Sequence, residues 1–143
     1  MRFGIHTLDE FDVAGKTVLC RLDLNQPVDR ATGTIILIGA CPEGLGSAKF
    51  EQWLLEAADA HSMIDRVHEH FELGGHKAAA IAMVLENAQI DLVSELPDAF
   101  VRSIFLNPQP SAQYALEEAF RRYGPEATVI AMPFGGATLP VLC

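Results

Sequence analysis

The chain lacks several features that would assign it to whole classes of protein. Its 143 residues contain no apolar run approaching the roughly twenty residues that cross a bilayer. Residues 1–6 also lack the apolar stretch of a secretory signal. We therefore expect a cytoplasmic protein that does not bind membranes. Three cysteines, Cys20, Cys41 and Cys143, are odd in number and widely spaced, which argues against a disulfide framework, so we expect reduced thiols.

Positive charge is scarce as well. Nineteen Asp and Glu residues outnumber ten Lys and Arg residues, which gives a formal net charge of −9. An acidic surface repels phosphate backbones, and no basic stripe interrupts it. The composition therefore argues against nucleic acid as a partner.

The remaining composition is that of one folded domain. Half of the residues are apolar, and the length suffices for one core but not for two. Short runs rich in β-branched residues alternate with segments of helical periodicity. We predict a single α/β domain over residues 1–143, Rossmann-like, with three layers and a mostly parallel sheet.

The predicted elements follow from these patterns and from their capping residues. Strands are expected over residues 16–24, 34–38, 90–93 and 128–132. Helices are expected from Ser47 to about residue 58 and over residues 62–71, 76–87, 97–104 and 111–122. Ser62 is the expected N-cap of the second helix, and the third, apolar all round, is expected to be buried. The turn residues of segment 27–33 favour a hairpin-like connection between the first two strands.

Loops that leave the carboxyl ends of parallel strands line the binding crevice of such folds. Here those loops are residues 40–46, 94–97 and 134–139. The candidate substrate-binding residues in them are Cys41, Glu43, Gly44, Glu95, Gly135, Gly136 and Thr138.

The first of these loops, Gly39–Ser47, joins a strand to a helix through several small residues. Such a loop can present backbone N–H groups and a helix N-terminus to a carboxylate or a phosphate. It lacks the Lys followed by Ser or Thr of a P-loop, and it does not match the dinucleotide fingerprint in register. A tight strand-to-helix turn is the other interpretation, and Glu43 would repel an anion unless it points away.

A second candidate is the segment Gly74-Gly-His-Lys77 at the start of the apolar helix. His76 could hydrogen-bond a small hydroxy acid and Lys77 could pair with its carboxylate. The alternative is a packed histidine beside a solvated lysine. No metal site is predicted, because His68 and His70 lie about 200° apart around a helix and cannot share an ion.

Four blocks in order resemble the C-terminal domain of the nickel-pincer lactate racemase family over about residues 33–143. They are Gly33–Ser47, residues 71–78, residues 93–97 and residues 124–142. The resemblance implies that the nickel-pincer nucleotide, its lysine attachment and the catalytic histidines belong to an N-terminal domain without a counterpart here. The family's Tyr-Gln-x-x-Lys motif is also missing, and His76 stands where the family has a tryptophan near the substrate. We expect no cofactor in this chain, and a nickel-pincer nucleotide only where a partner supplies it.

The preceding segment, about residues 7–32, resembles the N-terminus of phosphoglycerate kinase. The family's Arg-x-Asp-x-Asn-x-Pro pattern is present as Arg21, Asp23, Asn25 and Pro27. The resemblance implies that Asp23 and Asn25 match positions that hold phosphoglycerate. The other arginines, the nucleotide site and the second kinase domain are missing, so we expect no phosphoryl transfer.

Three hypotheses about function remain open. In the first, the chain is a truncated racemase relative, inactive alone, that acts as a lid or binding module for a 2-hydroxy acid site completed by a metal-binding, racemase-like chain. In the second, it is a small enzyme that uses His76, Lys77, Glu95 and Thr138 on a hydroxy or keto acid. In the third, it is a homo-oligomeric interaction module, because surfaces left open by the missing domain would be buried by association.

Overall fold

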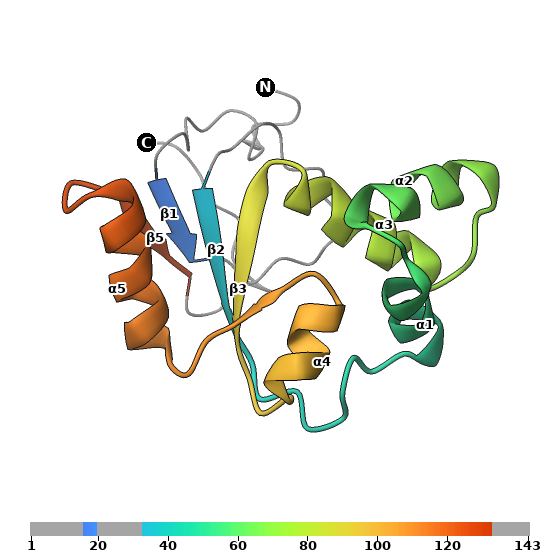
Figure 1. The fold of residues 1–143 in the computed structure, drawn as a ribbon, viewed down its shortest axis with the longest axis horizontal. Helices are drawn as coiled ribbons and strands as arrows, with labels where there is room; N and C mark the ends of the chain where they lie inside the picture. Colours follow the sequence, from blue (N-terminus) through green and yellow to red (C-terminus); the bar gives the residue numbers. More distant parts are fainter. Residues whose placement is uncertain (1–15, 20–32, 133–143) are drawn as a thin grey trace, which may run out of the picture.

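Five parallel strands form the centre of the computed structural model, which describes residues 16–19 and 33–132 (Figure 1). The strands are β1 (Lys16–Leu19), β2 (Gly33–Ile38), β3 (Ala88–Val93), β4 (Asn107–Pro108) and β5 (Val129–Ala131). They lie in the order β4-β3-β2-β1-β5. The order of the first four strands runs one way across the sheet, and β5 lies on the other side of β1. The direction therefore reverses between β1 and β5, as in doubly wound α/β folds.

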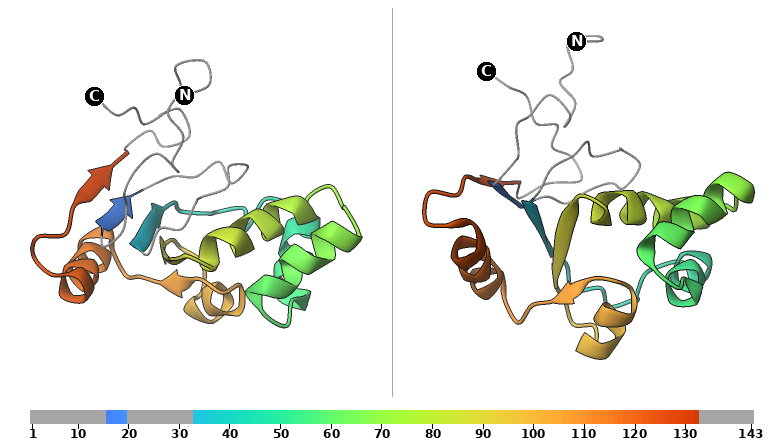
Figure 2. Two further views of the ribbon diagram at one scale, coloured as in Figure 1. Left: turned by 90° about the horizontal axis from the view of Figure 1, so that it is seen from above. Right: turned by 45° about the horizontal axis from the view of Figure 1, so that its top comes forward.

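Five helices connect and cover these strands. They are α1 (Ala48–Glu56), α2 (Ala60–Glu69), α3 (Gly75–Leu85), α4 (Asp98–Ser103) and α5 (Ala112–Tyr123). The group α1–α3 lies on one side of the sheet and α5 on the other (Figure 2). The predicted three-layer α/β architecture with a parallel sheet is confirmed.

The main core lies between the sheet and the group α1–α3. Ile35, Ile90 and Leu92 project from β2 and β3 into one cluster with side chains of those helices. Trp53 is fully buried in it, as are Ala78 and Ala82 of α3. The small side chains of α3 let the neighbouring helices approach closely, and the prediction that this helix is buried is confirmed.

Local capping explains where the helices begin, and it corrects one prediction. The Oγ atoms of Ser47 and Ser111 accept hydrogen bonds from the N–H groups of Phe50 and Tyr114, at 3.5 and 3.1 Å. The predicted cap Ser62 is wrong, since Asp59 accepts the N–H of Ser62 at 2.8 Å and α2 begins at Ala60. Ser62 instead donates its hydroxyl to the carbonyl of Asp59 from within the first turn.

The predicted hairpin between the first two strands is also wrong. β1 and β2 pair in parallel, with Thr17 opposite Thr34. A tight turn joins only antiparallel neighbours, so it cannot join these two strands. The connection itself lies outside the described residues. Strand β4, only two residues long, was not predicted.

None of the described helices is long and apolar enough to cross a membrane.

Candidate functional site

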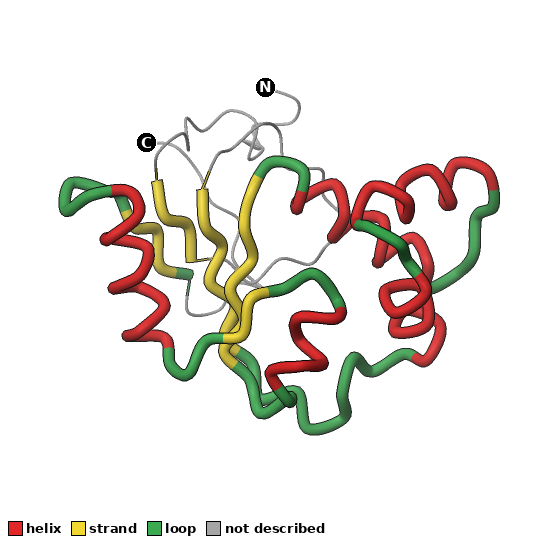
Figure 3. Tube along the Cα trace, viewed as in Figure 1, coloured by secondary structure: helices red, strands yellow, loops and turns green. Residues whose placement is uncertain are grey.

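The loops after β2 and β3 lie side by side at the carboxyl edge of the sheet (Figure 3). The N–H of Gly39 donates to the carbonyl of Val93 at 3.0 Å, and the N–H of Glu95 donates to the carbonyl of Ala40 at 3.1 Å. The prediction that these two loops share an edge is confirmed. The third predicted loop, with Gly135, Gly136 and Thr138, lies outside the described residues, as do Arg21, Asp23 and Asn25.

The loop after β2 folds as a tight turn that uses its own donors. Cys41, Gly44 and Gly46 have φ angles of 55°, 64° and 70°, the left-handed region. The N–H of Gly44 donates to the carbonyl of Cys41 at 3.0 Å, and the N–H of Gly46 donates to that of Glu43 at 3.3 Å. These two amides are therefore engaged within the loop, which favours the tight-turn interpretation over an anion cradle.

The side chains of this edge do not converge on one point. Cys41 is a half-buried free thiol, 3.4 Å from the carbonyl oxygen of Gly39. Glu43 and Glu95 are exposed, and among the described residues neither forms an ion pair. In the described part of the chain, no hydrogen bond or ion pair joins Cys41, Glu43 or Glu95 to His76 or Lys77.

The start of α3 is built by two glycines with different tasks. Gly74, the N-cap, has a φ of 99°, which side chains rarely adopt. Gly75 is buried against Trp53, and a Cβ atom there would lie 2.2 Å from the indole ring. The absence of both side chains lets the N-terminus of α3 approach α1.

As a result, the N-caps of α1 and α3 are neighbours. A Cβ atom at Gly74 would lie 3.1 Å from the Cβ of Lys49 and 3.6 Å from the Oγ of Ser47, the N-cap of α1. The positive ends of two helix dipoles are therefore close together. Such a pair favours a negative group nearby.

His76 has a defined environment at this point. Its Nδ1 accepts the N–H of Gly74 at 3.1 Å, so the neutral ring carries its proton on Nε2. The ring stacks on Phe71 with centroids 5.7 Å apart. Lys77, the next residue, is exposed and makes no ion pair within the described part of the chain.

A surface network beside this turn was not predicted from the sequence. Glu72 accepts the indole N–H of Trp53 at 2.7 Å and an ion pair from Lys49 at 3.1 Å. The hydrogen bond from Trp53, and then that from Lys49, lowers the pKa of the Glu72 carboxyl. Arg66 adds its guanidinium, which lies 4.2 Å above the Trp53 ring. This network could not be predicted from spacing in the sequence, because its residues come from α1, α2 and the loop before α3.

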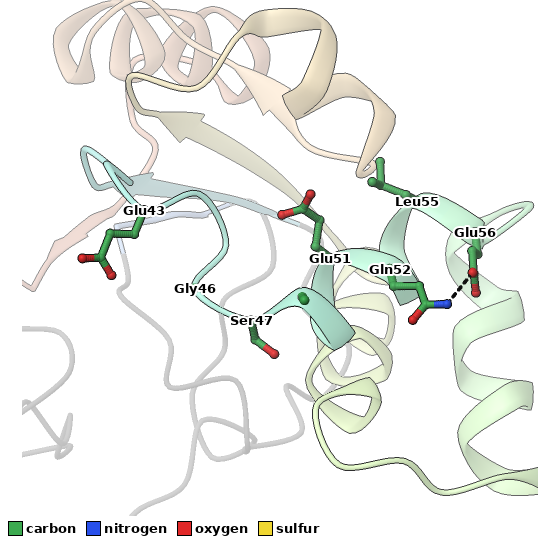
Figure 4. A pocket seen from close by; sticks show the side chains of 8 residues that line it. Glu43, Gly46, Ser47, Glu51, Gln52, Leu55 and Glu56 are labelled. Atoms are coloured by element: carbon green, nitrogen blue, oxygen red, sulfur yellow. Dashed lines mark hydrogen bonds between the residues drawn. The ribbon is translucent and has the colours of Figure 1, made fainter.

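An open hollow of about 670 Å³ lies along α1 and includes Ser47, the N-cap beside Gly74 (Figure 4). It is lined by Glu43, Gly46, Ser47, Ala48, Glu51, Gln52, Leu55 and Glu56. Gln52 donates to Glu56 at 2.6 Å, and this bond, followed by that from Arg66, lowers the pKa of the Glu56 carboxyl. Three carboxyl groups in one hollow would repel a carboxylate substrate. Of the predicted residues, the hollow contains only Glu43.

The histidines of α2 do not gather around a shared point. His61 pairs with Glu86 at 2.6 Å, and that hydrogen bond, followed by the charge of Asp65, raises the pKa of its imidazole. In the described ranges, no group of three or more His, Cys, Asp or Glu residues could hold a metal ion. The described side chains therefore offer no ligand set for a nickel-pincer group.

The other face of the sheet holds two buried polar side chains that were also not predicted. Asp91 of β3 accepts the side-chain amides of Gln89 and Asn107 at 2.6 and 3.2 Å, while its Oδ2 is buried without a partner. Thr34 contacts the Tyr123 hydroxyl and the Arg122 guanidinium of α5, at 3.1 and 3.0 Å. In the sequence, the polar residues 89 and 91 alternate with Ile90 and Leu92, and this alternation indicates that one face of β3 is polar.

Short parts of the chain are similar to phosphoglycerate kinases. A phosphoglycerate kinase of Methanobacterium bryantii is 47% identical over 36 residues, 25% of this chain and 9% of the kinase. One of Methanothermobacter thermautotrophicus is 53% identical over 34 residues, 24% of this chain and 8% of the kinase. This chain spans less than a tenth of either relative.

A longer likeness joins the chain to lactate racemase. The lactate racemase apoprotein of Thermoanaerobacterium thermosaccharolyticum matches the fold with a TM-score of 0.66 and 21% identity, over 73% of this chain and 26% of that chain. The family model "Lactate racemase C-terminal domain" matches residues 25–139, so the match starts before residue 33, where the resemblance was expected to begin, and includes Asn25. Because this match spans most of its length, the chain belongs to the lactate racemase C-terminal domain family.

Proposed function

We propose that this domain forms the carboxylate-binding side of a 2-hydroxy acid site, as a lid or binding module that another chain completes. The family name points to lactate, and the chain spans about a quarter of the racemase whose fold it matches. On this proposal the domain alone is inactive and works in the cytoplasm.

The observation that carries this proposal is the juxtaposition of two helix N-termini. The N-caps Ser47 and Gly74 are neighbours, and the exposed Lys77 lies in the first turn of α3. A substrate carboxylate would be attracted by both dipoles and by the ammonium group. The proton on Nε2 of a neutral His76 is a hydrogen-bond donor for the hydroxyl or the carboxylate.

A racemase needs a group that removes and returns the hydrogen at the carbinol carbon, and the family resemblance names a nickel-pincer nucleotide for it. The described residues do not fit such a group, since they offer no suitable ligand cluster. We assign the cofactor to the completing chain.

The kinase-like segment is a separate part of the proposal. We infer that residues 7–32 share ancestry with the N-terminus of phosphoglycerate kinase, which the short matches to two archaeal kinases support. Phosphoryl transfer depends on a positioned nucleotide and metal. The segment would then contribute a strand to the sheet without kinase activity.

A homo-oligomer is the alternative that a specific observation favours. Phe71 and Leu73 are 69% and 81% exposed, and exposed apolar side chains are commonly covered by association. Light scattering at high concentration distinguishes the two: a stable dimer supports this alternative, and a monomer supports the site completed by a different chain. The third hypothesis is a small stand-alone enzyme that acts on a hydroxy or keto acid. Turnover by the isolated domain would support it.

The binding proposal is tested by titrating lactate into the ¹⁵N-labelled domain. We expect shifts in the backbone amides of residues 47–50 and 74–78, and none with lactamide, which keeps the hydroxyl but lacks the charge. Lys77→Gln should weaken binding by about tenfold, since a charged hydrogen bond contributes about 1.5–3 kcal/mol. Arg102→Gln, which removes a charge from α4, is the matched control. Equal shifts with lactamide, or none with lactate, would refute the proposal.

A further inference from the structure

We propose that Glu72 is a positioning residue that fixes the Gly74–Lys77 turn and thereby sets where His76 lies. This inference deepens the proposed function. Only the ligand-binding measurement described below depends on that function. The carboxylate of Glu72 joins α1, α2 and the loop before α3 at one point, through Trp53, Lys49 and Arg66.

The first step is the contact between Glu72 and the core. Trp53 is fully buried, and its indole N–H donates to Glu72 Oε2 at 2.7 Å. The same ring fills the space that a side chain at Gly75 would need. Glu72 thus holds the surface against which the first residue of α3 packs.

The second step links Glu72 to His76 directly. The backbone carbonyl of Glu72 accepts the N–H of His76 at 3.3 Å. On either side of Glu72, Phe71 and Leu73 are largely exposed, and the Phe71 ring stacks on His76. Anchoring Glu72 inward therefore determines where Phe71 and the imidazole are held.

The third step concerns charge. The charged groups that pair with the Glu72 carboxylate are Lys49 of α1 at 3.1 Å and Arg66 of α2 at 3.9 Å, and Arg66 also pairs with Glu56 at 3.0 Å. From α3, His76 contacts Glu72 through its backbone N–H. The indole hydrogen bond and the Lys49 pair lower the pKa of Glu72 from its ordinary 4.5. A lowered carboxyl pKa means that the contact is intact above pH 4.5 and is lost as the pH falls through the lowered value. The turn is thus fixed at neutral pH.

The contact between Trp53 and Glu72 can be followed directly, because Trp53 is the one tryptophan of the chain. The indole N–H resonance in a ¹H–¹⁵N spectrum therefore reports the Glu72 contact without ambiguity. We expect this resonance to titrate below pH 4.5 in the wild type and to lose that titration in Glu72→Gln. A resonance that titrates equally in both proteins would overturn the inference.

Amide hydrogen exchange then tests whether the contact positions the turn. Glu72→Leu should speed exchange at His76 by about tenfold or more, with core amides of β3 unchanged, because local opening is less costly than unfolding. Glu72→Gln, which keeps an acceptor for the indole, should have a smaller effect. Glu69→Gln, an equal charge change at the exposed end of α2, is the control. If Glu72→Leu does not fold, the Glu72→Gln variant serves as the test. Amide chemical shifts of residues 74–77 that are unchanged in Glu72→Gln would then overturn the inference.

The ligand measurement separates this inference from the proposed function. If lactate binds the wild type, we expect Glu72→Gln to weaken binding while Glu69→Gln does not. If lactate does not bind at all, the proposed function fails, but the ligand-free indole and exchange measurements still decide the role of Glu72. Normal binding by Glu72→Gln together with an undisturbed turn would count against the positioning role.

Discussion

The two faces of the sheet are held in different ways. On the side of α1–α3, β2 and β3 project Ile35, Ile90 and Leu92 into a continuous apolar core. On the side of α5, buried Thr34 contacts Tyr123 and Arg122, and Asp91, alternating with the apolar core residues, points to the same side. The polar contacts of the first side, by contrast, lie at its exposed rim.

This difference separates two roles. Apolar burial supplies most of the stability but tolerates alternative packing, whereas buried hydrogen bonds lose much when one partner is missing. We infer that the α1–α3 side carries the stability of the domain, and that the α5 side fixes the placement of its single helix. The candidate site lies at the rim of the stable side, where α1 and α3 begin.

The largest expected effect comes from the apolar side. Ile90→Ala should lower the free energy of unfolding by about 2–5 kcal/mol, because a fully buried side chain leaves a cavity. Chemical denaturation monitored by circular dichroism measures the change. Val129→Ala, at a half-buried position of β5 that the register places on the same face as Thr34, is the control and should cost clearly less. Equal losses for the two would remove the distinction between the sides.

The sequence predicted the apolar side better than the polar one, for a physical reason. Helical periodicity predicted α1 and α5, and apolar runs predicted the buried helix α3 and the strand β2, since burial acts on each element separately. Asp59 was passed over because Ser62 has the same capping chemistry three residues later. The role of Glu72 could not be predicted, because its partner Trp53 lies 19 residues earlier in the chain, on α1.

The site shows the same limit. Sequence reasoning placed the loops after β2 and β3 at one edge of the sheet, which is confirmed, whereas the segment Gly74–Lys77 stays a predicted site. It could not show that the amides of Gly44 and Gly46 are already bonded within their loop, which depends on local backbone angles. Nor could it place Ser47 beside Gly74, because that contact depends on how closely α3 approaches α1.

A smaller effect is expected on the polar side. Asp91→Ala should destabilise the domain by about 1–3 kcal/mol, since the amides of Gln89 and Asn107 lose their acceptor. The same denaturation experiment applies, with Gln113→Ala on exposed α5 as control. If Asp91→Ala were as stable as the wild type, its hydrogen bonds would not hold this face together.

Thr34→Val gives a finer test of the α5 contact. Replacing the hydroxyl by a methyl group keeps the volume but removes the contacts to Tyr123 and Arg122, at an expected cost of about 1 kcal/mol. Tyr123→Phe in a double-mutant cycle should show a coupling with Thr34. Strictly additive effects would contradict a direct interaction.

The smallest effect should come from the rim of the apolar side. The pKa of His61 is raised by Glu86, so this pair stabilises the fold below about pH 6.5 and the benefit disappears as the pH rises through the raised value. His61→Gln should therefore remove a small decline in melting temperature between pH 6 and 9. His68→Gln, at an exposed position of the same helix, should leave that decline unchanged.

The role of the domain is tested most directly by native mass spectrometry of the protein isolated gently from its own source. If another chain completes the site, the domain should be found with a second polypeptide that carries nickel and a nucleotide-derived mass. A bare homo-oligomer or a free monomer, with no such partner, would contradict the proposed shared site.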